Sequence, residues 1–293
     1  MENDNLVGDI EKELQQDDLL KKRKIIIIIL YAIIILLIIG LIITMFFLIK
    51  NSKENDTTKQ DQTNESPFNR INKNNSDIIL IPKSGKYDYI LIWMHGLTCT
   101  PKDDVDHFDK KDGPVPGNFK IILPCAPTAY VTKLNQNTTS WFNLLGGMEP
   151  IEEKDVVFED LDESGNRIKQ LIEDEVKNVN NNYKRIFVGG FSQGACMSYH
   201  IGLSLEHTLG GIIPFNGFPV SKTKIFDDNF DNLNVFSVFG GEDIVMKLDY
   251  VYNQVLTILS KLKNLKIEIF KNESHSLNDY ELEYVKVFIK SLL

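Results

Sequence analysis

The sequence predicts an α/β domain with a mostly parallel, doubly wound sheet, preceded by a single transmembrane helix. Short, almost continuously apolar runs recur beyond residue 77, as in strands that are covered on both faces. Amphipathic stretches with helical spacing lie between some of these runs, and such alternation is typical of parallel sheets. An uncharged run of 25 residues near the N-terminus predicts the membrane-spanning helix.

The N-terminal run spans residues 25–49. At about 1.5 Å per residue, a helix of this length reaches about 37 Å, which is enough to cross a hydrocarbon core of about 30 Å. A cleaved signal peptide would have a shorter apolar region followed by small residues, whereas this run ends in bulky side chains. We therefore expect a retained membrane anchor.

Basic residues are more frequent before the anchor than after it. Residues 21–24 are all basic, while the other flank carries only scattered lysines. By the positive-inside rule, residues 1–24 form a cytosolic tail, and the rest of the chain is lumenal or extracellular. Residues 50–76 are polar and lack apolar periodicity, which predicts a flexible linker before a domain that spans residues 77–293.

The strands and helices of that domain follow from their apolar patterns. Strands are expected at residues 78–81, 89–93, 119–123, 185–188, 211–215, 235–239 and 266–270. Amphipathic helices are expected over residues 155–179, 250–262 and 277–293, because their apolar residues fall on one stripe. In such sheets the active site lies at the carboxyl ends of the strands, so functional residues are expected in the loops that follow them.

Composition excludes several classes of function. A formal net charge of −9 argues against a nucleic-acid partner, which would favour a basic surface. The three cysteines match no zinc-binding pattern, and no pair of the five histidines has metal-ligand spacing. We therefore expect neither a metal nor a cofactor.

The pentapeptide Gly190-Phe191-Ser192-Gln193-Gly194 follows one of the predicted strands and precedes a predicted helix over residues 195–201. This is the strand–turn–helix setting of a G-x-S-x-G nucleophile elbow, in which a sharp turn exposes the serine hydroxyl above the sheet. A plain turn with a helix-capping serine is the alternative. The setting favours Ser192 as a nucleophile.

A serine hydroxyl needs a base, and in this arrangement the acid and then the histidine follow the serine along the chain. His200 and His207 lie on the helix that leaves the elbow and point away from it, whereas His275 lies in the loop after the last predicted strand. The acid should follow the strand at 235–239. Asp243 is the preferred acid, with Glu242 as the alternative and Asp249 third.

An oxyanion hole needs two backbone donors. One is expected at the N–H of Gln193, directly after the nucleophile, and the other at the N–H of Leu97, in the loop after the strand at 89–93. His95 precedes Ser192 in the chain and is interpreted as a structural loop residue.

The domain resembles the acyl-protein thioesterase, or lysophospholipase/carboxylesterase, family of α/β-hydrolases from about Asp77 to Leu293. The motifs that carry the resemblance are HGL at 95–97, LPCAPTA at 123–129, SWFNLLG at 140–146, DESGNRIKQLIEDEVKN at 162–178, GGFSQGA at 189–195, GGEDIVM at 240–246 and SHSL at 274–277. The resemblance implies catalytic roles for Ser192, Asp243 and His275, with Leu97 and Gln193 donating to the oxyanion.

The sequence departs from the family pattern in two loops. HGLTCT at 95–100 replaces the usual HGLG-D, and GGEDIVMK at 240–247 replaces the usual GDxDPLVP, with Gly241 in place of the first Asp. Neither departure removes a member of the expected triad. Family members are also usually soluble and cytosolic, so the anchor is an addition.

These residues predict a serine hydrolase that cleaves an acyl ester or thioester through an acyl-Ser192 intermediate. The resemblance implies S-acylated proteins, lysophospholipids or simple carboxylesters as substrates. If the domain is lumenal, a lipid or small ester is favoured, because S-palmitoyl groups are expected mainly on cytosolic faces. The alternative is a membrane-tethered binding module that has the hydrolase scaffold without its activity.

Overall fold

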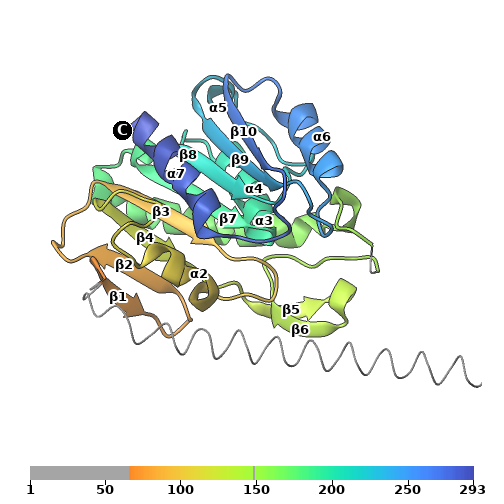
Figure 1. Cartoon of the computed structure of the whole chain (residues 1–293), viewed down its shortest axis with the longest axis horizontal. Coiled ribbons are helices and arrows are strands. Elements are labelled where there is room, and N and C mark those ends of the chain that lie inside the picture. The colour runs from red at the N-terminus through yellow and green to blue at the C-terminus, as the bar shows by residue number, and fades with distance from the viewer. Residues whose placement is uncertain (1–65, 148) are drawn as a thin grey trace, which may run out of the picture. The chain divides into compact units, whose positions relative to one another are not determined.

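A mixed eight-stranded sheet runs through residues 66–147 and 149–293, the part of the chain that the computed structural model describes (Figure 1). Its strands, in spatial order, are β1 (Phe68–Asn72), β2 (Ile78–Pro82), β4 (Phe119–Leu123), β3 (Tyr89–Met94), β7 (Ile186–Phe191), β8 (Gly211–Phe215), β9 (Asn234–Gly240) and β10 (Asn264–Phe270). The six strands from β4 to β10 pair in parallel, and β2 is antiparallel to both of its neighbours. The mostly parallel sheet is thereby confirmed.

Each of the seven predicted strands is present and begins within two residues of its expected position. The burial of their side chains explains why the apolar pattern of several of these strands stands out in the sequence. Strands β4 and β8 are buried along their whole length, and β3 and β7 are buried at all but one residue. Burial on both faces requires a continuous apolar run, and such a run stands out from the polar sequence around it.

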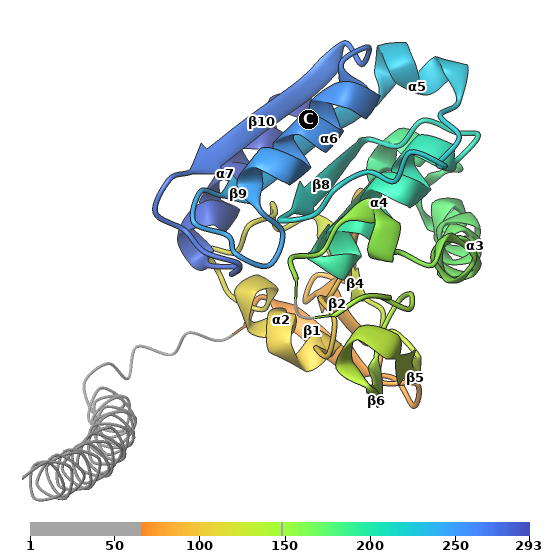
Figure 2. The ribbon, with the colours of Figure 1, turned by 90° about the vertical axis from the view of Figure 1, so that its right-hand side faces the viewer.

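Helices cover both faces of the sheet (Figures 1 and 2). The α-helices of the described residues are α2 (Pro101–Phe108), α3 (Phe158–Glu175), α4 (Gln193–Ser204), α5 (Asp227–Asn232), α6 (Leu248–Leu259) and α7 (Asp279–Leu292). Buried residues of α3, α4 and α6 share one core cluster, whereas those of α2 and α7 belong to a second cluster. Residues on β3 alternate between these clusters, with Ile92 in the first and Trp93 in the second, so the sheet lies between two apolar layers.

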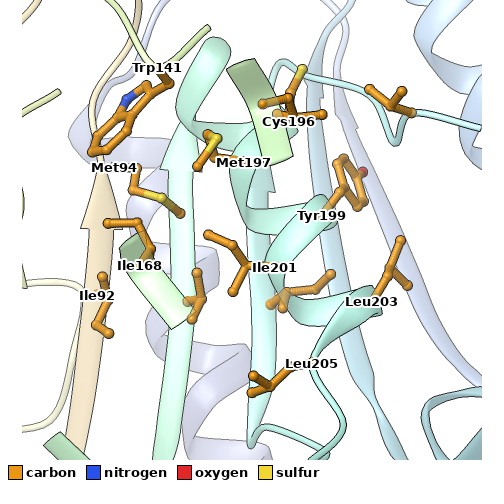
Figure 3. Packing of buried hydrophobic residues seen from close by; sticks show 14 of the residues in the cluster. Ile92, Met94, Trp141, Ile168, Cys196, Met197, Tyr199, Ile201, Leu203 and Leu205 are labelled. Atoms are coloured by element: carbon orange, nitrogen blue, oxygen red, sulfur yellow. The ribbon is translucent and has the colours of Figure 1, made fainter. Parts of the chain in front are cut away.

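The first core cluster lies directly beneath the loops at the carboxyl ends of the central strands. Figure 3 shows Met94 at the end of β3 near Met197 of α4 and Trp141, with Ile92 and Ile201 deeper in the layer. All five side chains are almost inaccessible to solvent. Burying side chains of this size contributes about 1.5–3 kcal/mol each to stability. The loops above them are therefore supported by a closely packed apolar layer.

Strand β1 lies within the segment 50–76 that the sequence predicts to be a flexible linker, and this part of the prediction is wrong. Phe68 is buried, but the other four residues of β1 are exposed. The strand is held by backbone pairing with β2, such as Arg70 opposite Leu80, which leaves no apolar period in the sequence. Residues 50–65 of that segment, the tail at 1–24 and the anchor predicted at 25–49 lie outside the described residues.

Short polar elements were not expected from the sequence. They are α2, α5 and a hairpin formed by β5 (Thr128–Val131) and β6 (Gln136–Thr139). Most residues of the hairpin are exposed, so no apolar alternation marks it. Across residues 66–147 and 149–293, none of the helices combines the length and the apolar character needed to span a bilayer.

Candidate active site

Ser192 stands on a sharp turn between β7 and α4. Its backbone has φ 57° and ψ −116°, a conformation that non-glycine residues rarely adopt. The turn is tight because its flanking glycines pack against other backbone. A β-carbon on Gly190 would lie 2.5 Å from the carbonyl oxygen of Met94, and one on Gly194 would lie 1.9 Å from the same atom. The glycines therefore let the elbow press against the end of β3, as the G-x-S-x-G pattern predicts.

The structure brings Ser192, His275 and Asp243 together from the loops after β7, β10 and β9. His275 Nε2 lies 2.8 Å from Ser192 Oγ, and His275 Nδ1 lies 2.6 Å from Asp243 Oδ2. A carboxylate can only accept, so Nδ1–H donates to Asp243 and Nε2 is left to accept the Ser192 hydroxyl proton. This tautomer is the one that a general base needs.

The carboxylate of Asp243 is buried, and both of its oxygens accept hydrogen bonds. Its side chain is 2 % exposed, compared with 15 % for His275. The second carboxylate oxygen accepts backbone N–H bonds from Val245 at 2.8 Å and Met246 at 2.9 Å. These donors hold the carboxylate in one orientation, so that it aligns the imidazole and stabilises the positive charge that forms when His275 takes a proton.

The other candidate acids and histidines lie elsewhere. Glu242 and Asp249 are exposed, whereas the carboxylate that bonds His275 is that of Asp243. His200 is buried on α4, where its Nδ1 lies 2.9 Å from the Thr223 hydroxyl, and burial lowers its pKa to about 4. His207 stacks on Tyr183 at 4.1 Å between ring centroids. Of the three candidate acids, it is Asp243 whose carboxylate the structure places against His275.

His95 is locked in place by the backbone. Its Nε2 accepts a 3.0 Å bond from Ala126 N–H, and its Nδ1 donates to the Gly96 carbonyl at 2.7 Å. Burial lowers the pKa of His95, so the ring is neutral. Both nitrogens are occupied, which agrees with its interpretation as a structural residue of the loop.

The two expected oxyanion donors belong to segments that adjoin the nucleophile. Gln193 is the first residue of α4, where N–H groups have no intrahelical acceptor. The Gly96–Leu97 loop passes so close that a β-carbon on Gly96 would lie 3.4 Å from Ser192 Cβ. Such N–H groups beside the hydroxyl form a suitable environment for negative charge.

The side chain of Gln193 has a structural role that the sequence did not suggest. It is fully buried, accepts from Trp141 N–H at 3.0 Å and donates to the Phe142 carbonyl at 2.8 Å. The indole of Trp141 in turn donates to the His95 carbonyl at 2.8 Å. The Ser-Trp-Phe segment therefore joins the elbow to the loop that contains Leu97, and a long-range contact of this kind leaves no local signal.

The three thiols are not competing nucleophiles. Cys99, Cys125 and Cys196 are free cysteines. Burial raises the pKa of Cys99 to about 11 and that of Cys196 to about 12, and it also raises the pKa of Cys125. A thiol with so high a pKa is protonated near neutral pH and is a poor nucleophile.

Comparison with known proteins places this site in context. A family model described as phospholipase/carboxylesterase matches residues 75–293. The acyl-protein thioesterase 1 homolog 2 of Dictyostelium discoideum is 29% identical over 235 residues, which cover 74% of this chain and 99% of that protein. Acyl-protein thioesterase 1 of Candida albicans is 30% identical over 185 residues, or 60% of this chain and 78% of the relative.

Solved structures show the same architecture. Acyl-protein thioesterase 2 of Zea mays aligns with a TM-score of 0.61 at 17% identity, over 74% of this chain and 98% of that one. A Bacillus cereus carboxylesterase aligns with a TM-score of 0.59 at 15% identity, over 74% and 94% of the two chains. At these identities the likeness concerns the fold, which is that of an α/β-hydrolase.

Proposed function

The chain belongs to the phospholipase/carboxylesterase family, and we propose that it hydrolyses acyl esters or thioesters through an acyl intermediate on Ser192. The observation that supports this most directly is the continuous hydrogen-bond chain from Ser192 Oγ through His275 to Asp243. Nucleophile, base and orienting acid are within hydrogen-bond distance and lie in the chain order of an α/β-hydrolase.

In the first half of the reaction, His275 Nε2 takes the proton of Ser192 as Oγ attacks the carbonyl carbon of the substrate. The carbonyl oxygen becomes an oxyanion and accepts hydrogen bonds from the N–H groups of Leu97 and Gln193. Collapse of this intermediate breaks the bond to the alcohol or thiol. His275 gives its proton to that leaving group, and the acyl group remains on Ser192.

In the second half, a water molecule takes the place of the leaving group. His275 removes a proton from this water as its oxygen attacks the acyl carbon, and a second oxyanion forms in the same hole. When it collapses, His275 returns the proton to Ser192 Oγ and the carboxylic acid leaves. Asp243 accepts the Nδ1 hydrogen bond throughout and stabilises each imidazolium.

The substrate class follows from the family and from the expected topology. The curated relatives named above are acyl-protein thioesterases, which supports an acyl ester or thioester as substrate. If residues 25–49 anchor the chain with its domain in a lumen or outside the cell, a lipid or small ester is favoured over a palmitoylated protein.

Protease added to sealed microsomes tests this topology. Digestion of the domain with protection of the N-terminal tail would reverse it.

Labelling with a fluorophosphonate probe tests the nucleophile. We expect wild-type protein to be labelled and Ser192→Ala to remain unlabelled. Ser198→Ala is the matched control, because Ser198 is a buried serine on α4 whose hydroxyl donates to the carbonyl of Ala195 and is not part of the predicted triad. Equal labelling of Ser192→Ala and wild type would refute the assignment.

Turnover of a short-chain p-nitrophenyl ester separates the hydrolase from the alternative, a tethered binding module without activity. A hydrolase releases p-nitrophenol over many turnovers, and Ser192→Ala reduces the rate by several orders of magnitude. A folded wild-type protein that neither turns over the ester nor reacts with the probe would support the binding module.

A further inference from the structure

Asn216 is a buried polar residue at the centre of the loops that carry the triad. It follows β8 directly, and the loops after β7 and β9 contribute Ser192 and Asp243 from the two neighbouring strands. The residue is 1 % exposed. Its φ is 50°, in the left-handed region where asparagine is tolerated better than most residues.

The carboxamide of Asn216 joins the acid loop to the histidine loop. Its Oδ1 accepts a 2.7 Å bond from the N–H of Gly240, three residues before Asp243. Its Nδ2 donates a 3.1 Å bond to the carbonyl of Ser276, the residue after His275. One planar group therefore links the two segments that must present Asp243 to His275.

The backbone at Asn216 completes this connection. Its N–H donates to the Val238 carbonyl of β9 at 2.9 Å, and the carbonyl of the preceding Phe215 accepts from Ser192 N–H at 2.9 Å. The residue is thus fixed to the nucleophile strand and to the acid strand before its side chain reaches the histidine loop. The Asn216 side chain therefore extends from a backbone that is held in place, and its bond to the Ser276 carbonyl restrains the backbone next to His275.

We propose that Asn216 is a positioning residue, which fixes His275 relative to Asp243 and Ser192 by holding the Gly240 and Ser276 backbones together. The inference rests on the hydrolase function proposed above. A misplacement of about 1 Å in a catalytic group can cost about 100-fold in rate, so a link one residue from the base has a direct effect on kcat.

The chemistry of the link is specific to a carboxamide. Gly240 offers a donor and Ser276 an acceptor, so the side chain between them must accept at one atom and donate at the other. Aspartate has the same shape and can still accept from Gly240, but its carboxylate repels the Ser276 carbonyl. Glycine at position 216 removes both bonds and is compatible with the positive φ.

The test compares Asn216→Asp and Asn216→Gly with the wild type. We expect kcat on a p-nitrophenyl ester to fall by about 10- to 100-fold in both variants while KM changes little. The rate of fluorophosphonate labelling at Ser192 should fall in parallel. The downfield proton resonance of His275 Nδ1–H should shift or disappear, because its bond to Asp243 lengthens. If the aspartate variant does not fold, the glycine variant decides.

Asn229→Asp is the matched control. Asn229 is also 1 % exposed, and its Nδ2 donates to the carbonyls of Gly202, Leu203 and Leu205, on the α4 side of the molecule. We expect this variant to lose stability but to retain its kcat and its downfield resonance.

The outcomes separate the inference from the function on which it rests. An unchanged kcat in folded Asn216 variants, or an equal loss in Asn229→Asp, would overturn the positioning role and leave the hydrolase intact. A wild-type protein that neither turns over the ester nor is labelled would overturn the proposed function, and the positioning role with it.

Discussion

The indole N–H of Trp141 donates a 2.8 Å hydrogen bond to the backbone carbonyl of His95. Both residues are buried, and their rings lie 5.2 Å apart between centroids. The bond ties the Ser-Trp-Phe segment to the loop whose next N–H groups include that of Leu97. The position of the proposed oxyanion donor therefore depends on a side chain that lies more than forty residues away in the sequence.

Trp141→Phe keeps most of the ring and removes this bond. We expect about 1–3 kcal/mol of lost stability, because the His95 carbonyl is left buried without the indole donor. We also expect a fall in kcat/KM of about 10-fold as the loop relaxes. Trp93→Phe is the control. This substitution also removes an indole hydrogen bond, the one to Asp104, but Trp93 packs in the second core cluster. An equal loss of activity in both variants would contradict the prediction.

Asp243→Asn should reduce kcat by about 10³- to 10⁴-fold, because an amide at this position favours the wrong tautomer of His275. Glu242→Gln should change kcat little, since Glu242 is exposed and the carboxylate that bonds the imidazole is that of its neighbour Asp243. Steady-state kinetics on the same ester measures both. A large loss in the glutamine variant would return the acid role to Glu242.

Gly241→Ala should destabilise the protein by about 1–3 kcal/mol and lower its activity. A β-carbon at this position would lie 2.4 Å from the carbonyl oxygen of Lys271, so the acid loop has to move away from the histidine loop. Gly117→Ala is the control, because a β-carbon there meets nothing within 4 Å. Urea unfolding measures the loss. Equal stability of the two variants would show that the loop accommodates the methyl group.

Glu281→Gln should change how stability depends on pH. Burial raises the pKa of Glu281 from 4.5 to about 7, and the charge of Glu273 adds to the rise. At a pH between these two pKa values, Glu281 keeps its proton in the folded state and has lost it in the unfolded state. The contribution of Glu281 to stability therefore falls as the pH rises through this range.

Urea unfolding at about pH 5 and about pH 8 measures the effect, and the expected result is that the variant gains on the wild type at the higher pH. Other titrating groups, such as His200, cancel in this difference. Glu283→Gln is the control, because that carboxylate is exposed on the same helix. A constant difference between Glu281→Gln and the wild type at both pH values would contradict the prediction.

Most of the strands that the sequence predicted well are buried on both faces, although β10, where only Phe270 is buried, was also predicted. Strands such as β4 and β8 are apolar at nearly every position because helices cover each side. Strand β1 and the β5–β6 hairpin are mostly exposed and are held by backbone pairing. Backbone hydrogen bonds do not depend on side-chain identity, so these strands left no pattern to detect.

The candidate site divides in the same way. Ser192 and His275 could be found from the sequence because a tight turn requires glycines beside the nucleophile and because chain order restricts the base. Asp243 and Glu242 are adjacent carboxylates that chain order cannot separate. The packing of Gly240 and Gly241 against the backbone of residues 271–274 decides which of them faces His275.

The sequence alone therefore predicted the fold class, a candidate nucleophile and the order of its expected partners, since these follow from local spacing and apolar periodicity. Only the tertiary structure showed Asp243, which the sequence already favoured, hydrogen-bonded to His275, and it revealed the links made by Trp141, the Gln193 side chain and Asn216. Each of these is a hydrogen bond between residues far apart in the chain. Their partners are mainly backbone groups, which every sequence possesses, so the bonds exist only once folding has brought the loops together.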